Sequence, residues 1–323
     1  MLKNAISPQS TNNILGINLD GERLLLVYGS LAGKVYETLS TPIRNKDNFH
    51  TILDQLSIDA DKLLSLVQAQ RMPLPDRVSV AITGDYDNET GILKSADDFP
   101  ELQDIAVRSQ ISVRFNLPVF MEQKANSGAL AEYLFDKDKA QRNLIFVSQD
   151  PILRLGILTD GKVYRNLGGT AGNIGALKVL NHPKTALSID YNQICSSNGM
   201  LYTLLHKHPQ HWEKDVSLNQ VIQDARKGDP YALEGFEEIG GILGQSLGNA
   251  ASLLRPDLFV LGYPGCLLGE PFELAVKKGI AEVSGLVDSK LPQVASSTLG
   301  VHLPELQALA PAINAYRNSE KTN

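Results

Sequence analysis

Hydrophobic and polar positions follow the same order twice along this chain. The first occurrence lies near the N-terminus, and the second runs from Asn143 to Leu177. Each pattern is typical of three short strands joined by turns, with hairpin signals at Asp20-Gly21 and at Asp160-Gly161. Helical patterns follow each set of strands. The repetition predicts a duplicated α/β protein with two lobes and a cleft between them.

The first half of the chain predicts an antiparallel meander covered by helices. The expected elements are strands at 14–17, 24–28 and 34–39, a helix at 48–70, a strand at 78–82, a helix at 102–115, a strand at 118–121 and a helix from residue 122. The run 78–82 is wholly apolar, as expected for a strand buried on both faces.

The second half predicts a second meander and a long core helix. The expected elements are strands within 144–164, a short helix at 218–225, a helix at 236–254 that Pro256 ends, a strand at 258–261 and a last helix at 304–316. We expect a polar arm at 1–12, an N-terminal lobe at 13–120 and a C-terminal lobe at 121–323. The last helix is a candidate to pack on the N-terminal lobe.

Composition narrows the class of protein. The 323 residues carry a net charge of −6 and a pI near 5.6, so no overall basic charge favours nucleic acid. Cys195 and Cys266 are the only cysteines, which fits a reducing compartment and forms no disulfide framework. Neither a signal peptide nor a membrane-spanning run is present, so we expect a cytoplasmic protein with no membrane contact.

Five segments resemble, in order and spacing, the motifs of the ROK family of bacterial sugar kinases and sugar-responsive repressors. They are the first phosphate motif GINLDGER, the loop AITGDYDNETG, the sugar-binding and catalytic segment FNLPVFMEQKANSGALAEYLF, the glycine-rich hallmark LTDGKVYRNLGGTAGNIG and the adenosine-side strand RPDLFVLGYPG. The resemblance covers about residues 14 to 316. It implies a two-lobed, actin-like (ribonuclease-H-like) sugar kinase fold with duplicated βββαβα units.

The position of the catalytic base departs from the family pattern. Family kinases carry Glu-Asn-Asp-Ala-Asn, whose Asp accepts the proton of the sugar hydroxyl, whereas this chain has Lys124 at that place. A lysine has a reference pKa of about 10.4 and needs a shift of several units to act as a base at neutral pH. The resemblance therefore implies no catalytic residue in this chain.

The segments that resemble the family's phosphate loops also differ from the family pattern. The family loops are rich in glycine because backbone N–H groups can then approach phosphate closely. Pro151 removes one such N–H group, and acids stand where a triphosphate would lie. Two like charges repel by roughly 4 kcal/mol when about 4 Å apart at an effective dielectric of about 20. The degenerate phosphate-loop positions are Asn18, Asp20, Gly21, Glu22, Asp150 and Gly262.

The sugar and zinc positions have changed as well. The Glu and His of the family hallmark are Asn173 and Ala176 here, and only Cys195 remains of the zinc motif. A structural zinc site needs about four ligands, so we predict no metal and no zinc site. The polar residues that remain as substrate-binding candidates in the cleft are Asp97, Glu122, Gln123, Lys124, Asn126, Gly169 and Asn173.

Structural explanations compete with these assignments. Lys124 can serve as the ion-pair partner of Glu122, Asp20 or Asp150 rather than as a displaced catalytic group. The glycines at 168–175 can cradle a ligand or allow close backbone packing. The histidines at 206, 208 and 211 have metal-like spacing, but an exposed polar segment is the commoner explanation.

Three functions follow from the resemblance. The first is a non-catalytic pseudokinase that acts as a sugar-sensing or regulatory binding module, with no cofactor and with a homodimer as its assembly. The second is a divergent kinase that uses Mg-ATP to phosphorylate a hexose or N-acetylhexosamine. The third is the sugar-responsive domain of a transcriptional regulator. Only a dozen residues precede residue 14, so we expect no winged helix and no direct DNA binding.

Overall fold

The chain folds into two compact units. The computed structural model describes residues 11–96, 98–136, 141–166, 171–179 and 189–320. The first unit takes in Met1–Asp138, Tyr164–Ala171 and Val301–Asn323, and the second takes in Lys139–Val163 and Gly172–Gly300. The boundary expected at residue 120 therefore moves to about residue 138, and the last helix belongs to the first unit. Each unit is described by itself, so the expected cleft between lobes stays a prediction. Residues 1–10 of the expected polar arm lie outside the described residues.

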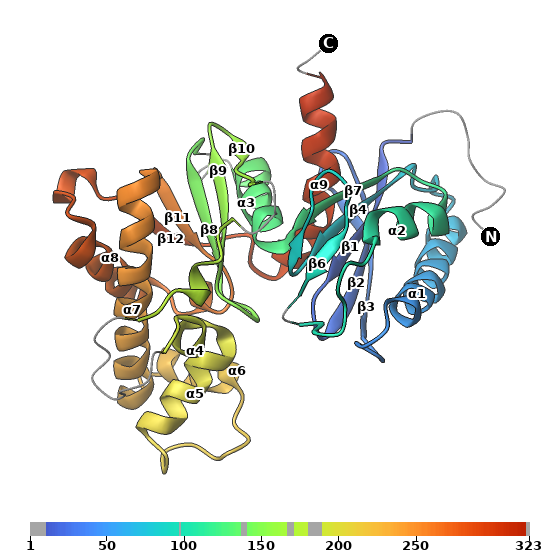
Figure 1. Cartoon of the computed structure of the whole chain (residues 1–323). Coiled ribbons are helices and arrows are strands. Elements are labelled where there is room, and N and C mark those ends of the chain that lie inside the picture. Colours follow the sequence, from blue (N-terminus) through green and yellow to red (C-terminus); the bar gives the residue numbers. More distant parts are fainter. Residues whose placement is uncertain (1–10, 97, 137–140, 167–170, 180–188, 321–323) are drawn as a thin grey trace. The chain divides into compact units, whose positions relative to one another are not determined.

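The first unit is built on a five-stranded sheet in the order β3-β2-β1-β4-β7 (Figure 1). Its strands are β1 (Asn13–Leu19), β2 (Arg23–Ser30), β3 (Val35–Pro42), β4 (Arg77–Ile82) and β7 (Val119–Gln123). The first three strands form the predicted antiparallel meander, and β4 and β7 run parallel to β1. A small hairpin of β5 (Asp85–Tyr86) and β6 (Leu93–Ser95) follows β4.

Helices cover both faces of this sheet. Against one face pack α1 (Phe49–Ala69) and α2 (Val107–Phe115), and against the other lie α3 (Lys124–Phe135) and α9 (Leu303–Glu320). Asn48 begins α1 by accepting a hydrogen bond from the backbone N–H of His50 at 2.9 Å. The expected helix at 102–115 begins only at Val107, because Ile105 pairs with Leu93 in a β-bridge.

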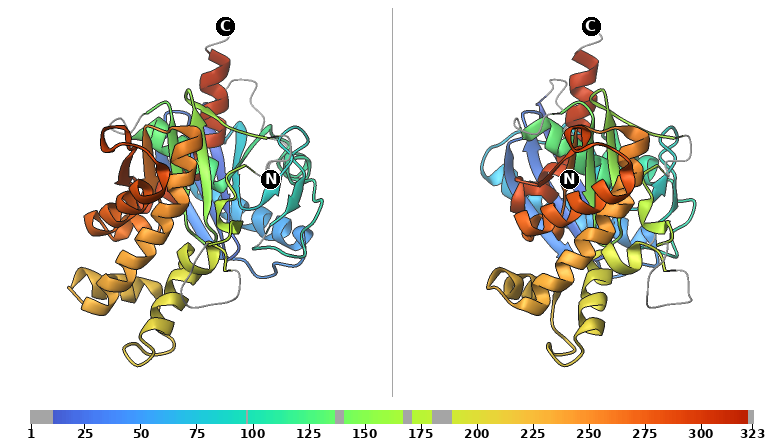
Figure 2. Two further views of the ribbon diagram at one scale, coloured as in Figure 1. Left: turned by 60° about the vertical axis from the view of Figure 1, so that its left-hand side comes forward. Right: turned by 90° about the vertical axis from the view of Figure 1, so that its left-hand side faces the viewer.

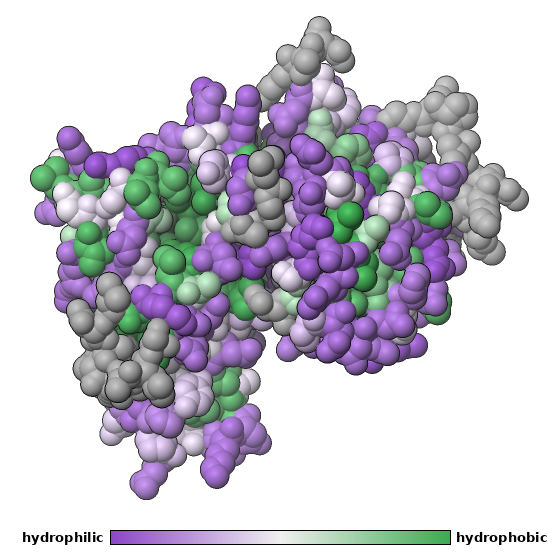
Figure 3. All heavy atoms as spheres, viewed as in Figure 1, coloured by the Kyte–Doolittle hydropathy of each residue, from purple (hydrophilic) through white to green (hydrophobic). Residues whose placement is uncertain are grey.

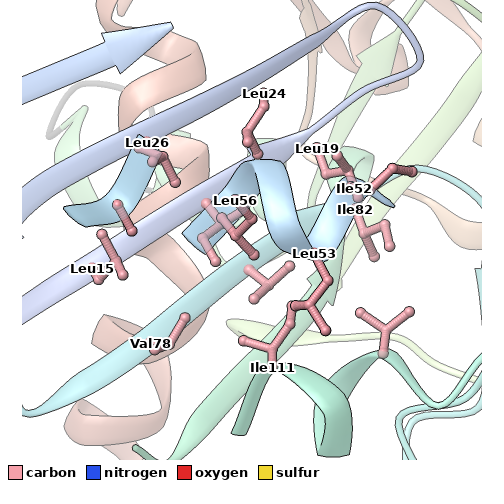
Figure 4. Close-up of a cluster of buried hydrophobic side chains, with 14 of the residues drawn as sticks. Leu15, Leu19, Leu24, Leu26, Ile52, Leu53, Leu56, Val78, Ile82 and Ile111 are labelled. Carbon is pink, nitrogen blue, oxygen red and sulfur yellow. The ribbon is translucent and has the colours of Figure 1, made fainter. Parts of the chain in front are cut away.

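Figure 4 shows how the core of the first unit is packed. Leucine, isoleucine and valine side chains of the strands meet those of α1 and α2, and all of them are almost completely buried. Burying one such side chain stabilises a protein by about 1.5–3 kcal/mol. The labelled side chains are Leu15, Leu19, Leu24, Leu26, Ile52, Leu53, Leu56, Val78, Ile82 and Ile111.

The second unit repeats the topology of the first. Its sheet has the order β10-β9-β8-β11-β12, with β8 (Leu144–Ser148), β9 (Arg154–Thr159), β10 (Lys162–Val163), β11 (Leu258–Leu261) and β12 (Gln293–Ser296). The expected turn at Asp160-Gly161 has φ angles of 53° and 71°, as a tight hairpin requires. The equivalent strand order confirms the predicted duplication.

Helices of the second unit surround the outer part of its sheet. They are α4 (Asn192–Cys195), α5 (Ser197–Lys207), α6 (Leu218–Arg226), α7 (Pro230–Leu254) and α8 (Glu270–Ser284), with short 3-10 turns η3 (Ile174–Ala176), η4 (Gly265–Leu267) and η5 (Asp288–Lys290). The turn η6 (Gly300–His302) leads back into the first unit. The helices α7 and α8 lie side by side (Figure 2). They approach so closely that a Cβ atom on Gly244 would lie 2.1 Å from the carbonyl oxygen of Val276. The sequence patterns missed α8 and β12, and α7 begins six residues earlier than expected, after the N-cap Asp229.

Candidate functional site

Three parallel strands of the first unit end in one row. The residues of that row, paired across β1, β4 and β7, are Leu19, Ile82 and Gln123. The next residues along the three strands are Asp20, Thr83 and Lys124, which are all polar. Ligands of open α/β sheets bind beyond the carboxyl ends of parallel strands. We call Asp20, Thr83 and Lys124, together with Asp98 from the loop between β6 and α2, the carboxyl edge of the first unit.

The backbone donors of the first phosphate loop are already engaged. The Oδ1 atom of Asp20 accepts hydrogen bonds from the backbone N–H groups of Glu22 at 3.1 Å and Arg23 at 2.8 Å. The Oδ2 atom of Asp98 accepts another from the N–H of Gly21 at 3.3 Å. A Cβ atom on Gly21 would lie 2.4 Å from the side chain of Asp98, so glycine is required there. Carboxylates of the chain thus bind the backbone N–H donors of this loop.

Lys124 belongs to the same cluster. Its Nζ lies 3.4 Å from Oδ2 of Asp20, and its side chain is only 12% exposed. Of the three acids considered as ion-pair partners of Lys124, the structure shows Asp20. Burial raises the pKa of the nearby Asp98 carboxyl, against the opposing effects of Thr83 and Lys124. The structure therefore pairs the residue at the family's base position with an acid of the phosphate loop.

Glu122 forms a second cluster one residue before the end of β7. Its side chain is 2% exposed, and its Oε1 accepts hydrogen bonds from the backbone N–H of Gln123 and from Nδ2 of Asn126, both at 3.0 Å. The hydroxyl of Tyr86 lies 3.1 Å from the same oxygen. Arg165 donates to Oε2 through Nε at 3.0 Å and also through its terminal nitrogen. Both carboxylate oxygens are thus fully satisfied within the protein.

The charges of this cluster stabilise one another. Burial alone would lower the pKa of the Arg165 guanidinium, but the carboxylate of Glu122 raises it overall. Burial, and then the charge of Glu122, raise the pKa of Tyr86 far above its ordinary value. The cavity that remains between these groups measures about 10 Å³, enough for about one water molecule but too small for a sugar. In this conformation Arg165 fills the space beside Glu122.

Two other sequence candidates have structural partners. Gln123 is the N-cap of α3, where its side-chain oxygen accepts hydrogen bonds from the N–H groups of Ala125 and Asn126 at 2.9 and 3.2 Å. Asn18 is 2% exposed and donates through Nδ2 to the carbonyl oxygen of Pro304 at 3.0 Å. Both residues therefore support the backbone around the carboxyl edge. The remaining candidates Asp97 and Gly169 lie outside the described residues.

The loop after β4 is held by its own side chains. Asp87 accepts hydrogen bonds from the N–H groups of Glu89 and Thr90, both at 2.9 Å. The hydrogen bonds from Thr90 lower the pKa of the Asp87 carboxyl. Gly91 has a φ angle of 71°, which favours glycine, and the side chain of Arg108 packs over it. These retained family positions shape the loop that carries Tyr86.

The matching edge of the second unit is closed. Asp150 accepts a hydrogen bond from the Ser197 hydroxyl at 2.6 Å, at the start of α5. Gln149 is fully buried and donates to the carbonyl oxygen of Cys195 at 3.0 Å. A Cβ atom on Gly262 would lie 2.6 Å from the ring of Phe146, so this glycine serves close packing. Asn173 stands before η3 and makes no capping hydrogen bond with its side chain.

The cysteine and histidine positions do not fit a metal. Burial raises the pKa of the Cys195 thiol well above its ordinary value, whereas a zinc ligand must be a thiolate. The rings of His208 and His211 pack against Tyr231, and His211 pairs with Asp229 at 2.8 Å. Within the ranges that the structure describes, no group of three or more potential metal ligands occurs.

Apolar surface remains on the helices of the second unit. Leu253 on α7 is 83% exposed and Leu274 on α8 is 57% exposed, and Figure 3 shows hydrophobic side chains over these helices. A search of the described helices finds none with the length and apolar character needed to cross a bilayer.

The sequence analysis did not predict four of the residues that form the site. They are Tyr86, Thr83, Asp98 and Arg165. Tyr86 and Thr83 lie within the family-like loop AITGDYDNETG, and Arg165 lies within the hallmark segment, so the motifs pointed to the right stretches. Asp98 is adjacent to the candidate Asp97. A motif match identifies a segment, whereas the pairing of strands decides which of its side chains meet.

Comparison with known proteins agrees with this architecture. The xylose repressor of Bacillus subtilis is 27% identical over 233 residues, which cover 71% of this chain and 59% of the repressor. The chain thus spans less than two thirds of that relative. A ROK family transcriptional regulator, a homolog of the Escherichia coli Mlc protein, superposes with a TM-score of 0.82 at 19% identity, covering 93% of this chain and 78% of the regulator.

A ROK family glucokinase from Streptomyces griseus, solved with glucose and AMPPNP, superposes with a TM-score of 0.77 at 19% identity, covering 92% of this chain and 97% of the kinase. These likenesses confirm the predicted two-lobed, actin-like α/β fold. A model of the ROK family matches residues 38–272. Because this match covers well over half of the sequence, the chain belongs to the ROK family.

Proposed function

We propose that this chain is a non-catalytic ROK module that binds a sugar-class ligand at the carboxyl edge of its first unit and serves sensing or regulation. The observation that carries the proposal is the occupation of the phosphate-loop donors by carboxylates of the chain. Asp20 and Asp98 together accept from three consecutive backbone N–H groups of the first loop. A nucleotide phosphate would have to displace two carboxylates to reach those donors.

The second loop supports the same proposal. Asp150 places a negative charge at the start of α5, where a phosphate would profit from the helix N-terminus. Gln149 lies under Gly265, so that its Oε1 is 2.4 Å from where a Cβ atom on that glycine would be. The residues at both loops therefore do not fit the phosphates of Mg-ATP. We derive no phosphoryl transfer through them.

Similarity to a repressor favours a regulatory role. The xylose repressor of Bacillus subtilis is named for repression, and the chain shares sequence with part of it. In such a role the chain would report sugar binding to a partner, and the exposed apolar side chains of α7 and α8 offer a surface for a homodimer. Direct DNA binding is not part of this proposal, and an electrophoretic shift on promoter DNA by the purified chain would argue for the regulator alternative.

The test is a search for nucleotide and sugar binding by thermal unfolding. A ligand present at about a hundred times its dissociation constant adds about 2.7 kcal/mol, which shifts Tm by a few degrees. We expect a shift with at least one sugar and none with millimolar Mg-ATP or Mg-ADP. The glucokinase from Streptomyces griseus, assayed in parallel, shows that the conditions detect both ligands. Phosphorylation of any hexose that depends on Mg-ATP and on Asp20 or Asp98 would overturn the proposal.

A divergent hexose or N-acetylhexosamine kinase is the second candidate. The observation that favours it is Asp98, a half-buried carboxyl with a raised pKa beside the position of the lost base. Such a group is suited to accept a proton from a sugar hydroxyl. A coupled assay on wild type and Asp98→Asn separates the two candidates, because only a kinase has turnover for the substitution to abolish.

A further inference from the structure

The carboxyl edge of the first unit has more negative than positive charge. Asp20 and Asp98 both lie near Lys124, and Lys124 is within ion-pair distance of Asp20 only. Among the described residues, no cation lies within such a distance of Asp98. Asp98 accepts a hydrogen bond from the backbone N–H of Gly21 at 3.3 Å, and the charge of Lys124 lowers its pKa against the effect of burial. One lysine thus faces two carboxylates, which leaves the edge with a net negative charge.

A buried hydroxyl stands beside this carboxylate. Thr83 is 5% exposed and adjoins the Asp98 carboxyl, whose pKa it lowers. Its Oγ makes no well-formed hydrogen bond with any of the residues described. A buried polar atom without a partner costs free energy, so such an atom at the end of a strand indicates a missing ligand or water. The two lone pairs of this hydroxyl oxygen are therefore open to a donor.

Apart from the ammonium of Lys124, which pairs with Asp20, the unfilled groups at this edge are acceptors. The backbone donors nearby, on Gly21, Glu22 and Arg23, are already used by Asp20 and Asp98. An anionic ligand would meet two carboxylates and one lysine, and the repulsion would exceed the attraction. A neutral hydroxyl supplies one donor and no charge. A protonated amine supplies three donors and the missing positive charge.

We infer that the ligand of the carboxyl edge is an amine-bearing sugar, whose ammonium group is received by Asp98 and Thr83. This inference rests on the proposed function, because it names the chemical class of the ligand for the same site. Burial raises the pKa of Asp98 because it disfavours the charged carboxylate. A cation placed beside the carboxylate would stabilise that charged form.

The experiment compares matched sugars by isothermal titration calorimetry on the full chain. Each of glucosamine, galactosamine and mannosamine is titrated beside its N-acetyl derivative and its parent hexose, which lack the ammonium group. A charge-assisted hydrogen bond in a half-buried site corresponds to roughly 10- to 100-fold in affinity. We expect at least one free amino sugar to bind tighter than both of its neutral counterparts by a factor in that range.

Two variants assign the preference to its residues. Asp98→Asn keeps the shape and removes the charge, and Thr83→Val keeps the shape and removes the hydroxyl. Asp98→Asn should abolish the preference for the amino sugar, and Thr83→Val should weaken it several-fold. The matched control is Asp104→Asn, an exposed acid of the same loop that pairs with Lys94 at 2.9 Å. Unfolding curves without ligand show whether each variant is folded.

Each outcome decides the inference. An amino-sugar preference that Asp98→Asn removes and Asp104→Asn keeps would support it. Equal binding of neutral hexoses and amino sugars would overturn it and leave the proposed function intact. A preference that survives in Asp98→Asn would also overturn it, because the charge would then come from elsewhere. Binding of no sugar at all would overturn the proposed function together with the inference.

Discussion

The two units share a strand order but differ at the carboxyl ends of their parallel strands. In the first unit this edge presents Asp20, Asp98 and Lys124, which are partly accessible, beside the buried hydroxyl of Thr83, which has no hydrogen-bond partner among the described residues. In the second unit Gln149 is fully buried and Asp150 is bonded to the Ser197 hydroxyl. The first edge is polar and partly exposed, whereas the second is closed by buried side chains.

The difference shows that two units with the same strand order can differ in what their carboxyl edges are able to bind. Strand order brings the same edge together in both units, because parallel strands end side by side. What the edge can bind depends on the few residues that follow each strand. Acids that bond to the backbone of their own loop, as Asp20 does, remove donors from a ligand. In the second unit Asp150 instead accepts from the Ser197 hydroxyl.

The largest effect is expected at Glu122, which anchors the polar side of the first unit. Glu122→Ala leaves the Arg165 guanidinium without its carboxylate and removes one of the acceptors around the buried Tyr86 hydroxyl, which keeps the carbonyl oxygen of Met121. Breaking a buried ion pair on one side costs about 3–5 kcal/mol, so Tm should fall steeply. Glu122→Gln should fall between this variant and wild type, and the exposed Asp104→Asn is the control. A loss below about 1 kcal/mol would show that Arg165 and Tyr86 are solvated and the edge is not built around Glu122.

The closed edge of the second unit is tested at Gly265. In Gly265→Ala the new methyl group would lie 2.4 Å from Oε1 of the buried Gln149, which cannot leave for solvent. Such overpacking costs about 1–3 kcal/mol. Gly241→Ala, where the structure shows open space on α7, is the matched control and should stabilise by up to about 1 kcal/mol.

A double variant sharpens this test. Because Gln149→Ala removes the side chain that the methyl group meets, the cost of Gly265→Ala should shrink in that background. Denaturant unfolding of the four proteins in the cycle measures the coupling. Additive costs would mean that Gln149 does not fill the space under Gly265, and the comparison of an open and a closed edge would fail.

The raised pKa of Asp98 predicts that the stability of Asp98→Asn relative to wild type depends on pH. Its pKa is raised in the folded chain, so the folded state holds the proton to higher pH than the unfolded state. Ionisation therefore lowers stability as the pH rises through the folded pKa. Asp98→Asn cannot ionise, so it should be more stable than wild type at neutral pH and equal to it in acid. Thermal unfolding across pH measures this gain, and a gain that grew on acidification would contradict the assignment.

The smallest effect is expected at Asp150. Asp150→Asn keeps a side-chain oxygen that can accept from the Ser197 hydroxyl, and only the charge at the start of α5 is lost. The change should be within about 0.5–1 kcal/mol. Nucleotide binding should still be absent, because Gln149 and the first loop are unchanged. Detection of Mg-ATP binding by this variant in calorimetry would mean that one charge, rather than a closed edge, excludes the nucleotide.

Most strands and helices could be predicted from periodicity alone. The meanders, α1, β4, α3 and β11 lie within a few residues of their expected positions, because each carries a strong pattern of period two or 3.6 or an apolar run between turn signals. The failures have local causes. Helix α2 starts late because Ile105 is used in a β-bridge, and β12 is a short, partly exposed edge strand without a wholly apolar run. The domain boundary shifted because contacts rather than sequence order group α3 with α9.

The sequence by itself determined the family-like segments and the presence of Lys124 and of the acids Asp20 and Asp150 within them, because residue identity at motif spacing is local information. Only the tertiary structure decided that Lys124 pairs with Asp20, that Arg165 pairs with Glu122 and that Gln123 caps a helix. These pairings join residues up to 104 positions apart in the chain. They depend on strand register and on burial, which raises the free energy of every polar atom left without a partner.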